Sequence, residues 1–183
     1  MSSPIFTVPN QLTFLRLGFL PFFIISIQYH HYDWALGILI VAGFTDALDG
    51  LLARSLNQKT ALGAYLDPIA DKLLLSSSFV VLALNGKIRW WLAILVLGRD
   101  VLMLTAASVI IIVVGQRPFP PSVFGKLTTA LQILLVFSVL FLAVFNIHWL
   151  QPARQFLGYL VAGFTVFSGF HYSFVIARRL SSA

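Results

Sequence analysis

The chain has 183 residues, of which 59% are hydrophobic and only 10% are charged, and its mean hydropathy is +0.93. A soluble domain carries about 25% charged residues, so this composition excludes a soluble globular protein and predicts an integral membrane protein. The absence of cysteine excludes disulfides and zinc sites built from thiolates. The twelve cations are scattered between apolar runs rather than gathered in a basic stripe, so no nucleic-acid partner is expected despite a net charge of +6.

Six apolar segments follow one another along the chain, each long enough to cross about 30 Å of hydrocarbon as an α-helix. We expect them at 12–28, 34–55, 61–84, 90–114, 123–146 and 153–177. The predicted fold is all-α, an integral membrane bundle of six transmembrane helices forming a single domain over 1–183. A short interfacial segment can precede the first helix. The N-terminus lacks the pattern of a cleaved secretory signal, so the first segment is expected to remain in the protein.

The distribution of charge predicts how the bundle is oriented. With the N-terminus inside, the inner loops and tail hold Arg54, Lys59, Arg117, Lys126, Arg178 and Arg179. The outer loops hold only Lys87, Arg89 and Arg154, which agrees with the excess of basic residues on the inner side of membrane proteins. All four tryptophans (Trp34, Trp90, Trp91 and Trp149) fall at the outer segment ends, as in an interfacial belt. A bacterial or mitochondrial inner membrane is expected. The end of segment 2 and the start of segment 3 should face the cytoplasm or matrix.

Four aspartates lie in these two neighbouring apolar segments: Asp46 and Asp49 in the second, Asp67 and Asp71 in the third. An aspartate in mid-membrane opposes insertion by about 2.5–3.5 kcal/mol, so the four together oppose it by roughly 10 kcal/mol. Clustered carboxylates also repel one another unless protons or cations intervene. These residues therefore need a compensating partner, and a divalent metal site is the economical explanation.

The spacing of these aspartates suits such a site. Asp49 follows Asp46 by three positions and Asp71 follows Asp67 by four, so each pair lies on one face of its helix. A short polar turn joins the two segments, which should pack antiparallel and bring the pairs together. Oxygen-only ligands favour Mg²⁺ or Mn²⁺, and two such ions suit phosphoryl transfer. A carboxylate that the metal does not saturate can accept the proton of an attacking hydroxyl.

The full motif resembles the signature of the CDP-alcohol phosphatidyltransferase family. It reads Asp46-x2-Asp49-Gly50-x2-Ala53-Arg54-x8-Gly63-x3-Asp67-x3-Asp71. The resemblance extends to the number of helices, to an opening Pro9-Asn10-x-Leu12-Thr13-x2-Arg16, and to a late Gly125-Lys126-x-Thr128-x-Ala130-x-Gln132.

The resemblance implies a metal-dependent enzyme whose donor is CDP-diacylglycerol and whose leaving group is CMP. It implies two metal ions held by the four aspartates, with Asp71 also acting as the general base. Gly50, Ala53, Arg54 and Gly63 would bind the donor nucleotide. The acceptor hydroxyl would attack the lipid-side phosphorus in line, and the family's common dimeric state implies a homodimer.

The acceptor is expected to be of the glycerol type, with Arg99, Arg117 and Lys126 as candidate contacts. Phosphatidylglycerophosphate synthases usually carry a further arginine eight residues after the one that matches Arg99, where this chain has Ala107. The Arg99-Asp100-Val101 form looks more like the CMP-forming cardiolipin synthases. We therefore favour phosphatidylglycerol as acceptor over glycerol-3-phosphate.

Simpler interpretations stand beside these. The four aspartates can be explained by ion pairs with Arg54, Lys72 or Arg99. Arg99 and Asp100 can form an intramembrane salt bridge, although adjacent helical positions point apart. Asn10, Thr13 and Arg16 can be a helix start with an interfacial anchor. The four histidines are interpreted as structural. In a different class, a cation-coupled transporter would also keep intramembrane carboxylates, but it predicts inverted repeats or broken helices, and neither is evident.

Overall fold

The computed structural model describes residues 8–55, 61–114 and 123–180, with side chains over 14–45, 72–105 and 123–172. This part of the chain forms six α-helices. Their bounds are α1 Val8–Gln28, α2 Tyr32–Ser55, α3 Ala61–Leu84, α4 Trp90–Val114, α5 Val123–Phe145 and α6 Gln151–Leu180. The all-helical prediction is confirmed, and each expected segment corresponds to one helix.

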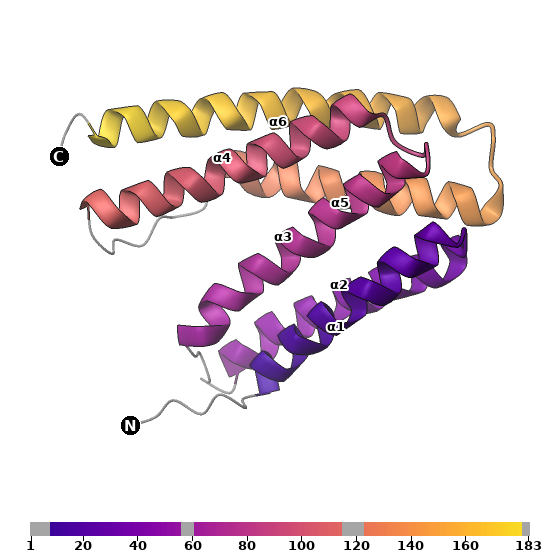
Figure 1. The fold of residues 1–183 in the computed structure, drawn as a ribbon, viewed down its shortest axis with the longest axis horizontal. Helices are drawn as coiled ribbons and strands as arrows, with labels where there is room; N and C mark the ends of the chain where they lie inside the picture. Colours follow the sequence, from indigo (N-terminus) through magenta and orange to yellow (C-terminus); the bar gives the residue numbers. More distant parts are fainter. Residues whose placement is uncertain (1–7, 56–60, 115–122, 181–183) are drawn as a thin grey trace.

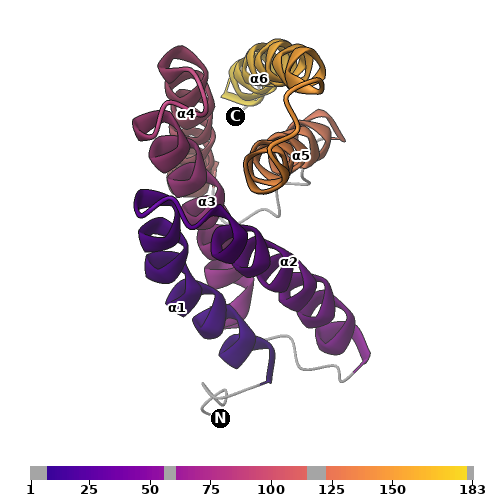
Figure 2. The same ribbon diagram turned by 90° about the vertical axis from the view of Figure 1, so that its right-hand side faces the viewer.

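The helices form two groups joined through α3. In Figure 1, α1 and α2 lie together below while α4, α5 and α6 lie together above, and α3 runs diagonally between them. α1 packs against α2 and α3, and both of these helices also contact α5. α4 packs against α3 and α6, and α6 packs against α5 as well. Figure 2 shows α5 and α6 side by side and α1 flanking α2 and α3. The α2–α3 hairpin is therefore held by α1 and α5; the described residues make no direct contact between α2 and α3.

The core between the groups is built from large apolar side chains. Phe23 and Ile27 of α1, Phe79 and Leu82 of α3, and Leu140 of α5 are all completely buried. The opposite faces of the helices are also apolar, because Phe22, Phe44, Ile94, Phe156 and Phe170 are each more than 60% exposed. A surface so rich in large apolar side chains suits contact with lipid.

Within the described residues, α5 is long and apolar enough to span a membrane, and Phe14–Gln28, Tyr32–Thr45 and Lys72–Leu84 are shorter apolar helical stretches. The fold is thus an all-helical bundle of the membrane type.

Two of the turns between helices end their first helix in the same way. Gly86 has a positive φ of 66°, and the amides of Gly86 and Lys87 donate to the carbonyls of Ala83 and Leu82 at 3.0 and 2.8 Å. This is a Schellman arrangement, in which a left-handed residue closes the helix. His30, with a φ of 62°, closes α1 similarly. The sharp closure of α3 places residues 87–89 directly over the start of α4.

Candidate active site

The backbone brings the aspartate positions to one end of the bundle. Positions 46 and 49 lie near the end of α2, and positions 67 and 71 lie in the first half of α3. Figure 1 shows the end of α2 and the start of α3 toward the same end of the bundle, but Figure 2 shows them apart, and the described residues make no contact between the two helices. The two helices run in opposite directions, as the sequence predicts, but the predicted packing of one against the other is not found among the described residues, where α1 and α5 lie against both. The convergence of the two aspartate pairs on one site therefore remains a prediction.

The side chains of several predicted site residues lie outside the described residues. These are the four aspartates and the predicted donor contacts Gly50, Ala53, Arg54 and Gly63, although each position lies within a helix. Arg117 lies wholly outside the described residues. The metal-ligand and nucleotide-binding assignments therefore remain predictions.

A cavity of about 520 Å³ adjoins these positions and is lined by described residues of α1, α2, α3 and α5. Its wall includes Ala42 and Gly43, one turn before Asp46, and Lys72, which directly follows Asp71. The other lining residues are Arg16, Leu39, Leu74, Leu75, Thr129, Ala130, Ile133, Leu134 and Phe137. An apolar cavity with two cations suits a ligand with apolar chains and an anionic headgroup.

Arg16 is the less expected of these two cations. It lies in the first half of α1, is only 2% exposed, and lines the cavity. A guanidinium this deeply buried needs an anionic or polar partner. The sequence offered a simple interfacial anchor as an alternative, and burial of the side chain contradicts it. The available signal was an arginine inside an apolar segment, which usually marks a functional site in a membrane protein.

Lys72, the second cation, belongs to a buried network that joins three helices. Its Nζ donates to Oδ1 of Asp100 at 2.5 Å, and Nη1 of Arg99 donates to the same oxygen at 2.8 Å. The network is extended by Ser76, whose hydroxyl lies 3.4 Å from Oδ2 of Asp100, and by Ser168, which accepts from Nη2 of Arg99 at 3.3 Å. Two cations around one carboxylate fix α3, α4 and α6 together and leave one positive charge in excess.

This network confirms one of the simpler interpretations and weakens another. Arg99 and Asp100 do pair, although their adjacency on a helix predicts that they point apart, because the long arginine side chain curls back to its neighbour. Lys72 and Arg99 were also candidate ion-pair partners for the four aspartates, and both are engaged with Asp100. The simple salt-bridge explanation of the aspartates therefore loses much of its support.

The predicted acceptor contacts are not gathered by the described structure. Arg99 is buried in the network on α4, whereas Lys126 is exposed near the start of α5. Thr128, two residues later, is buried against α6, where its hydroxyl donates to the carbonyl of Phe124 at 2.8 Å and lies 3.3 Å from that of Phe164. This part of the late motif packs α5 against α6, and Lys126 points away from that contact.

Gln132 is the last residue of the late motif. Its side chain is completely buried on α5, and neither amide atom has a hydrogen-bond partner among the described residues. Such a group is expensive to bury, which makes it the polar residue of the core that is hardest to explain by packing alone.

Comparison with known proteins agrees with this geometry. A human cardiolipin synthase (CMP-forming) is 33% identical over 189 aligned positions, covering 91% of this chain and 61% of the relative. A probable phosphatidylglycerophosphate synthase of Mycobacterium tuberculosis is 38% identical over 131 positions, covering 67% of this chain and 60% of the relative. A putative cardiolipin synthase of the same species is 39% identical over 100 positions, covering 54% and 48%. The chain thus spans less than two thirds of the length of each of these relatives.

A family model gives the broader assignment. The model described as CDP-alcohol phosphatidyltransferase matches residues 6–167, a range that includes the aspartate positions, the cavity, and Lys72, Arg99 and Asp100 of the buried network. The helix order, the spaced aspartates and this match agree, and the chain belongs to the CDP-alcohol phosphatidyltransferase family.

Proposed function

We propose that this protein transfers the phosphatidyl group of CDP-diacylglycerol to phosphatidylglycerol, forming cardiolipin and releasing CMP. The single observation that carries the choice of a lipid acceptor is the apolar cavity of about 520 Å³ beside the aspartate positions. Its lining suits diacylglycerol chains, and its cations Arg16 and Lys72 suit phosphate groups at their head. Family membership favours a transferase over the transporter alternative.

The donor set fits the metal that the family resemblance implies. The four carboxylates, two near the end of α2 and two in the first half of α3, form an oxygen-only set, suited to Mg²⁺ or Mn²⁺. We assign Asp46, Asp49, Asp67 and Asp71 to hold it, as two ions. When bound, the ions would neutralise the pyrophosphate of the donor and stabilise the leaving phosphate.

The protein's own groups then have distinct tasks. The acceptor hydroxyl forms a new bond to the phosphorus on the diacylglycerol side, the bond from that phosphorus to the phosphate of CMP breaks, and the hydroxyl proton passes to the carboxylate of Asp71. Gly50, Ala53, Arg54 and Gly63 are proposed to hold the nucleotide. Arg16 and Lys72 orient lipid phosphates in the cavity.

The charges of the described residues support the choice of acceptor. Glycerol-3-phosphate is a small dianion from water, which favours two or three converging cations. Of the predicted acceptor contacts, Arg99 is already paired with Asp100, and Lys126 is exposed on another helix. A lipid acceptor arrives with its headgroup at the interface and needs fewer fixed charges. The relative named phosphatidylglycerophosphate synthase keeps glycerol-3-phosphate as the second candidate.

The deciding experiment offers both acceptors at equal concentration to the purified full chain with CDP-diacylglycerol and Mg²⁺. Mass spectrometry of the products should show cardiolipin as the main phospholipid, with CMP in equal amount. If phosphatidylglycerophosphate were the main product, the proposed acceptor would be wrong but the phosphatidyltransferase activity would stand. If no CMP were released with either acceptor, the proposed activity itself would be wrong.

Two further assignments belong to this proposal. We place the protein in a bacterial or mitochondrial inner membrane with the aspartates facing the cytoplasm or matrix, on the strength of its loop charges. We also infer a homodimer from the family resemblance. Labelling of cysteines introduced at the two ends of the bundle tests the orientation, and light scattering in detergent tests the dimer.

A further inference from the structure

The end of the bundle opposite the aspartates carries a second cavity, of about 90 Å³, between the start of α4 and the start of α6. Three cations line it: Lys87 and Arg89 from the turn that follows α3, and Arg154 from the first turn of α6. They are the whole set of basic residues that the sequence places on the outer side. Charge patterning explains the inner cations, but it offers no reason for three outer cations to gather at one cavity.

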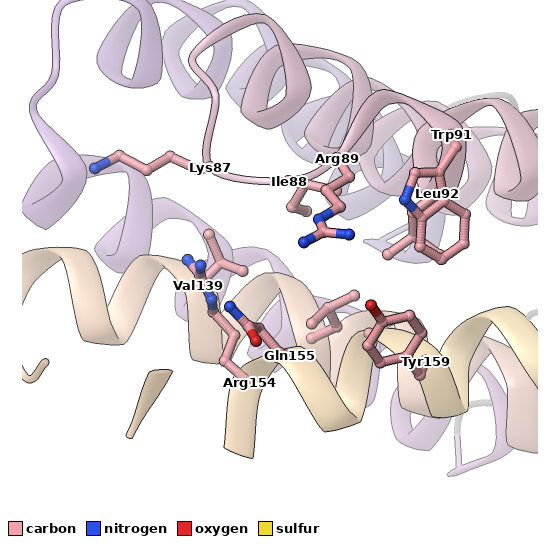
Figure 3. Close-up of a pocket in the computed structure, with 11 residues that line it drawn as sticks. Lys87, Ile88, Arg89, Trp91, Leu92, Val139, Arg154, Gln155 and Tyr159 are labelled. Carbon is pink, nitrogen blue, oxygen red and sulfur yellow. The ribbon is translucent and has the colours of Figure 1, made fainter. Parts of the chain in front are cut away.

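These cations converge from two separate elements. Figure 3 shows Arg89 reaching from the chain before α4 toward α6, while Arg154 and Gln155 reach from α6 toward Arg89. Lys87 lies to one side, with its Nζ 4.8 Å from the ring centre of Tyr32. Like charges brought together in this way repel unless an anion lies between them.

None of the described residues that line this cavity supplies such an anion. No carboxylate is among the residues lining this cavity, and the ion pairs found among the described residues do not involve Arg89 or Arg154. The Asp100 network differs in this respect, because a carboxylate lies between its two cations. The compensating charge at the outer cavity must therefore come from solution or from the bilayer.

The remaining walls favour the bilayer as the source. Leu92, Leu135 and Val139 form an apolar floor, and the rings of Trp91 and Tyr159 stack at 6.1 Å beside it. Both rings are more than 40% exposed, and Ile94, one turn further along α4, is 63% exposed. Aromatic rings of this kind sit at the level of lipid headgroups, and the exposed apolar face below them suits an acyl chain.

We propose that this outer cavity binds the phosphodiester headgroup of an anionic phospholipid. Arg89 and Arg154 hold the phosphate oxygens, Gln155 donates a further hydrogen bond, and Trp91 and Tyr159 cover the upper part of one acyl chain. Arginine suits this task because its planar donors match phosphate geometry. The site is separate from the proposed transferase site, which lies at the other end of α3.

The test is a local fluorescence measurement that needs no turnover. The substitutions Trp34→Phe, Trp90→Phe and Trp149→Phe leave Trp91, in the wall of the cavity, as the sole tryptophan. The full chain is placed in bilayers containing equal fractions of a brominated phospholipid, either phosphatidylglycerol or phosphatidylcholine. Quenching by brominated phosphatidylglycerol should show a clearly higher apparent affinity.

The variants locate that preference. Arg89→Gln or Arg154→Gln should lower it about 5-fold, and the double variant about 25-fold. Arg154→Lys should keep most of it. Arg179→Gln, near the other end of α6, removes the same charge and should leave the preference unchanged. Circular dichroism of each variant checks that the bundle is intact, and the single variants decide the matter if the double variant does not fold.

A soluble ligand is tested in the same system. Inorganic phosphate, compared with chloride at matched ionic strength, should not displace the brominated anionic lipid. Equal quenching by the two lipids, or an equal loss in Arg179→Gln and Arg154→Gln, would overturn the proposal. Full displacement by phosphate would overturn it as well, because the occupant would then be a free phosphate.

Discussion

The two ends of the bundle treat their charges differently. At the inner end, the cations Lys72 and Arg99 share the carboxylate of Asp100, close to four further aspartate positions. At the outer end, Arg89 and Arg154 line a cavity that contains no acid. The inner end compensates its cations with its own carboxylate, whereas we propose that the outer cavity takes its compensating charge from a ligand. Because the hydrocarbon strongly penalises uncompensated charge, the sign of what is lacking at each end indicates what that end binds.

The largest expected effect comes from removing the cation at the inner end. Chelation of divalent metal should abolish phosphatidyl transfer, and Mg²⁺ or Mn²⁺ should restore it, because four carboxylates would otherwise repel each other and the donor pyrophosphate. Asp67→Asn should lower turnover by at least about 10²-fold. Radiolabelled CMP release measures both, and full turnover by Asp67→Asn in metal-free buffer would contradict the metal site.

A second substitution separates the proton acceptor from the metal ligands. Asp71→Asn should lose turnover by about 10²-fold or more and still bind CDP-diacylglycerol, because the amide cannot take the acceptor proton. Asp49→Asn should instead weaken donor and metal binding together. Equilibrium binding of the donor, measured beside turnover, distinguishes them. Equal losses of donor affinity in the two variants would mean that Asp71 acts chiefly as a ligand.

The Asp100 network provides a test by stability rather than activity. Asp100→Leu leaves Lys72 and Arg99 without their shared carboxylate and should lower the free energy of unfolding by about 3 kcal/mol. The triple variant Lys72→Met, Arg99→Met and Asp100→Leu should recover most of that loss, because no unpaired charge is left. Thermal unfolding in detergent measures both. An unstable triple variant would show that the network itself, and not its balance of charge, holds α3, α4 and α6 together.

The smallest expected effect concerns Gln132, a buried neutral group whose amide has no hydrogen-bond partner among the described residues. Gln132→Met should raise the free energy of unfolding by about 1 kcal/mol, because a buried amide without hydrogen bonds is replaced by an apolar side chain of similar size. Val136→Ala, one turn away and also buried, is the control with the opposite sign. Destabilisation by Gln132→Met would show that the amide is satisfied in the membrane.

Much of the fold was predictable because apolar length and turn residues set the helices. α3 and α4 begin and end where the sequence predicts, since Asn85, Gly86 and Lys87 interrupt the apolar run between them. α1 and α6 are longer than predicted: α1 spans Val8–Gln28 against a predicted 12–28, and α6 spans Gln151–Leu180 against a predicted 153–177. Pro9 and Pro152 lie outside the predicted segments, yet both lie in the first turn of a helix, where proline is tolerated. The last turn of α6 includes Arg178 and Arg179, whose charge favours a helix C-terminus.

The site was less predictable than the helices. The placement of each aspartate pair on one helix follows from spacing alone, whereas the predicted packing of α2 against α3 is not found among the described residues. The Lys72–Asp100 pair joins residues 28 positions apart, and no local pattern indicates such a contact. The burial of Arg16 depends on how α1 packs against α2 and α3, which is a tertiary property. The convergence of Arg89 and Arg154 likewise depends on the packing of α4 against α6.

The walls of the larger cavity have a kinetic consequence. Ile133 and Leu134 of α5 line it and are each about half exposed, so the cavity borders the lipid-facing surface. Substrates that enter from the side diffuse in two dimensions and never pass through water. The turnover rate should then follow the mole fraction of donor in the bilayer rather than its bulk concentration. Adding inert phospholipid at constant substrate would slow the reaction by surface dilution.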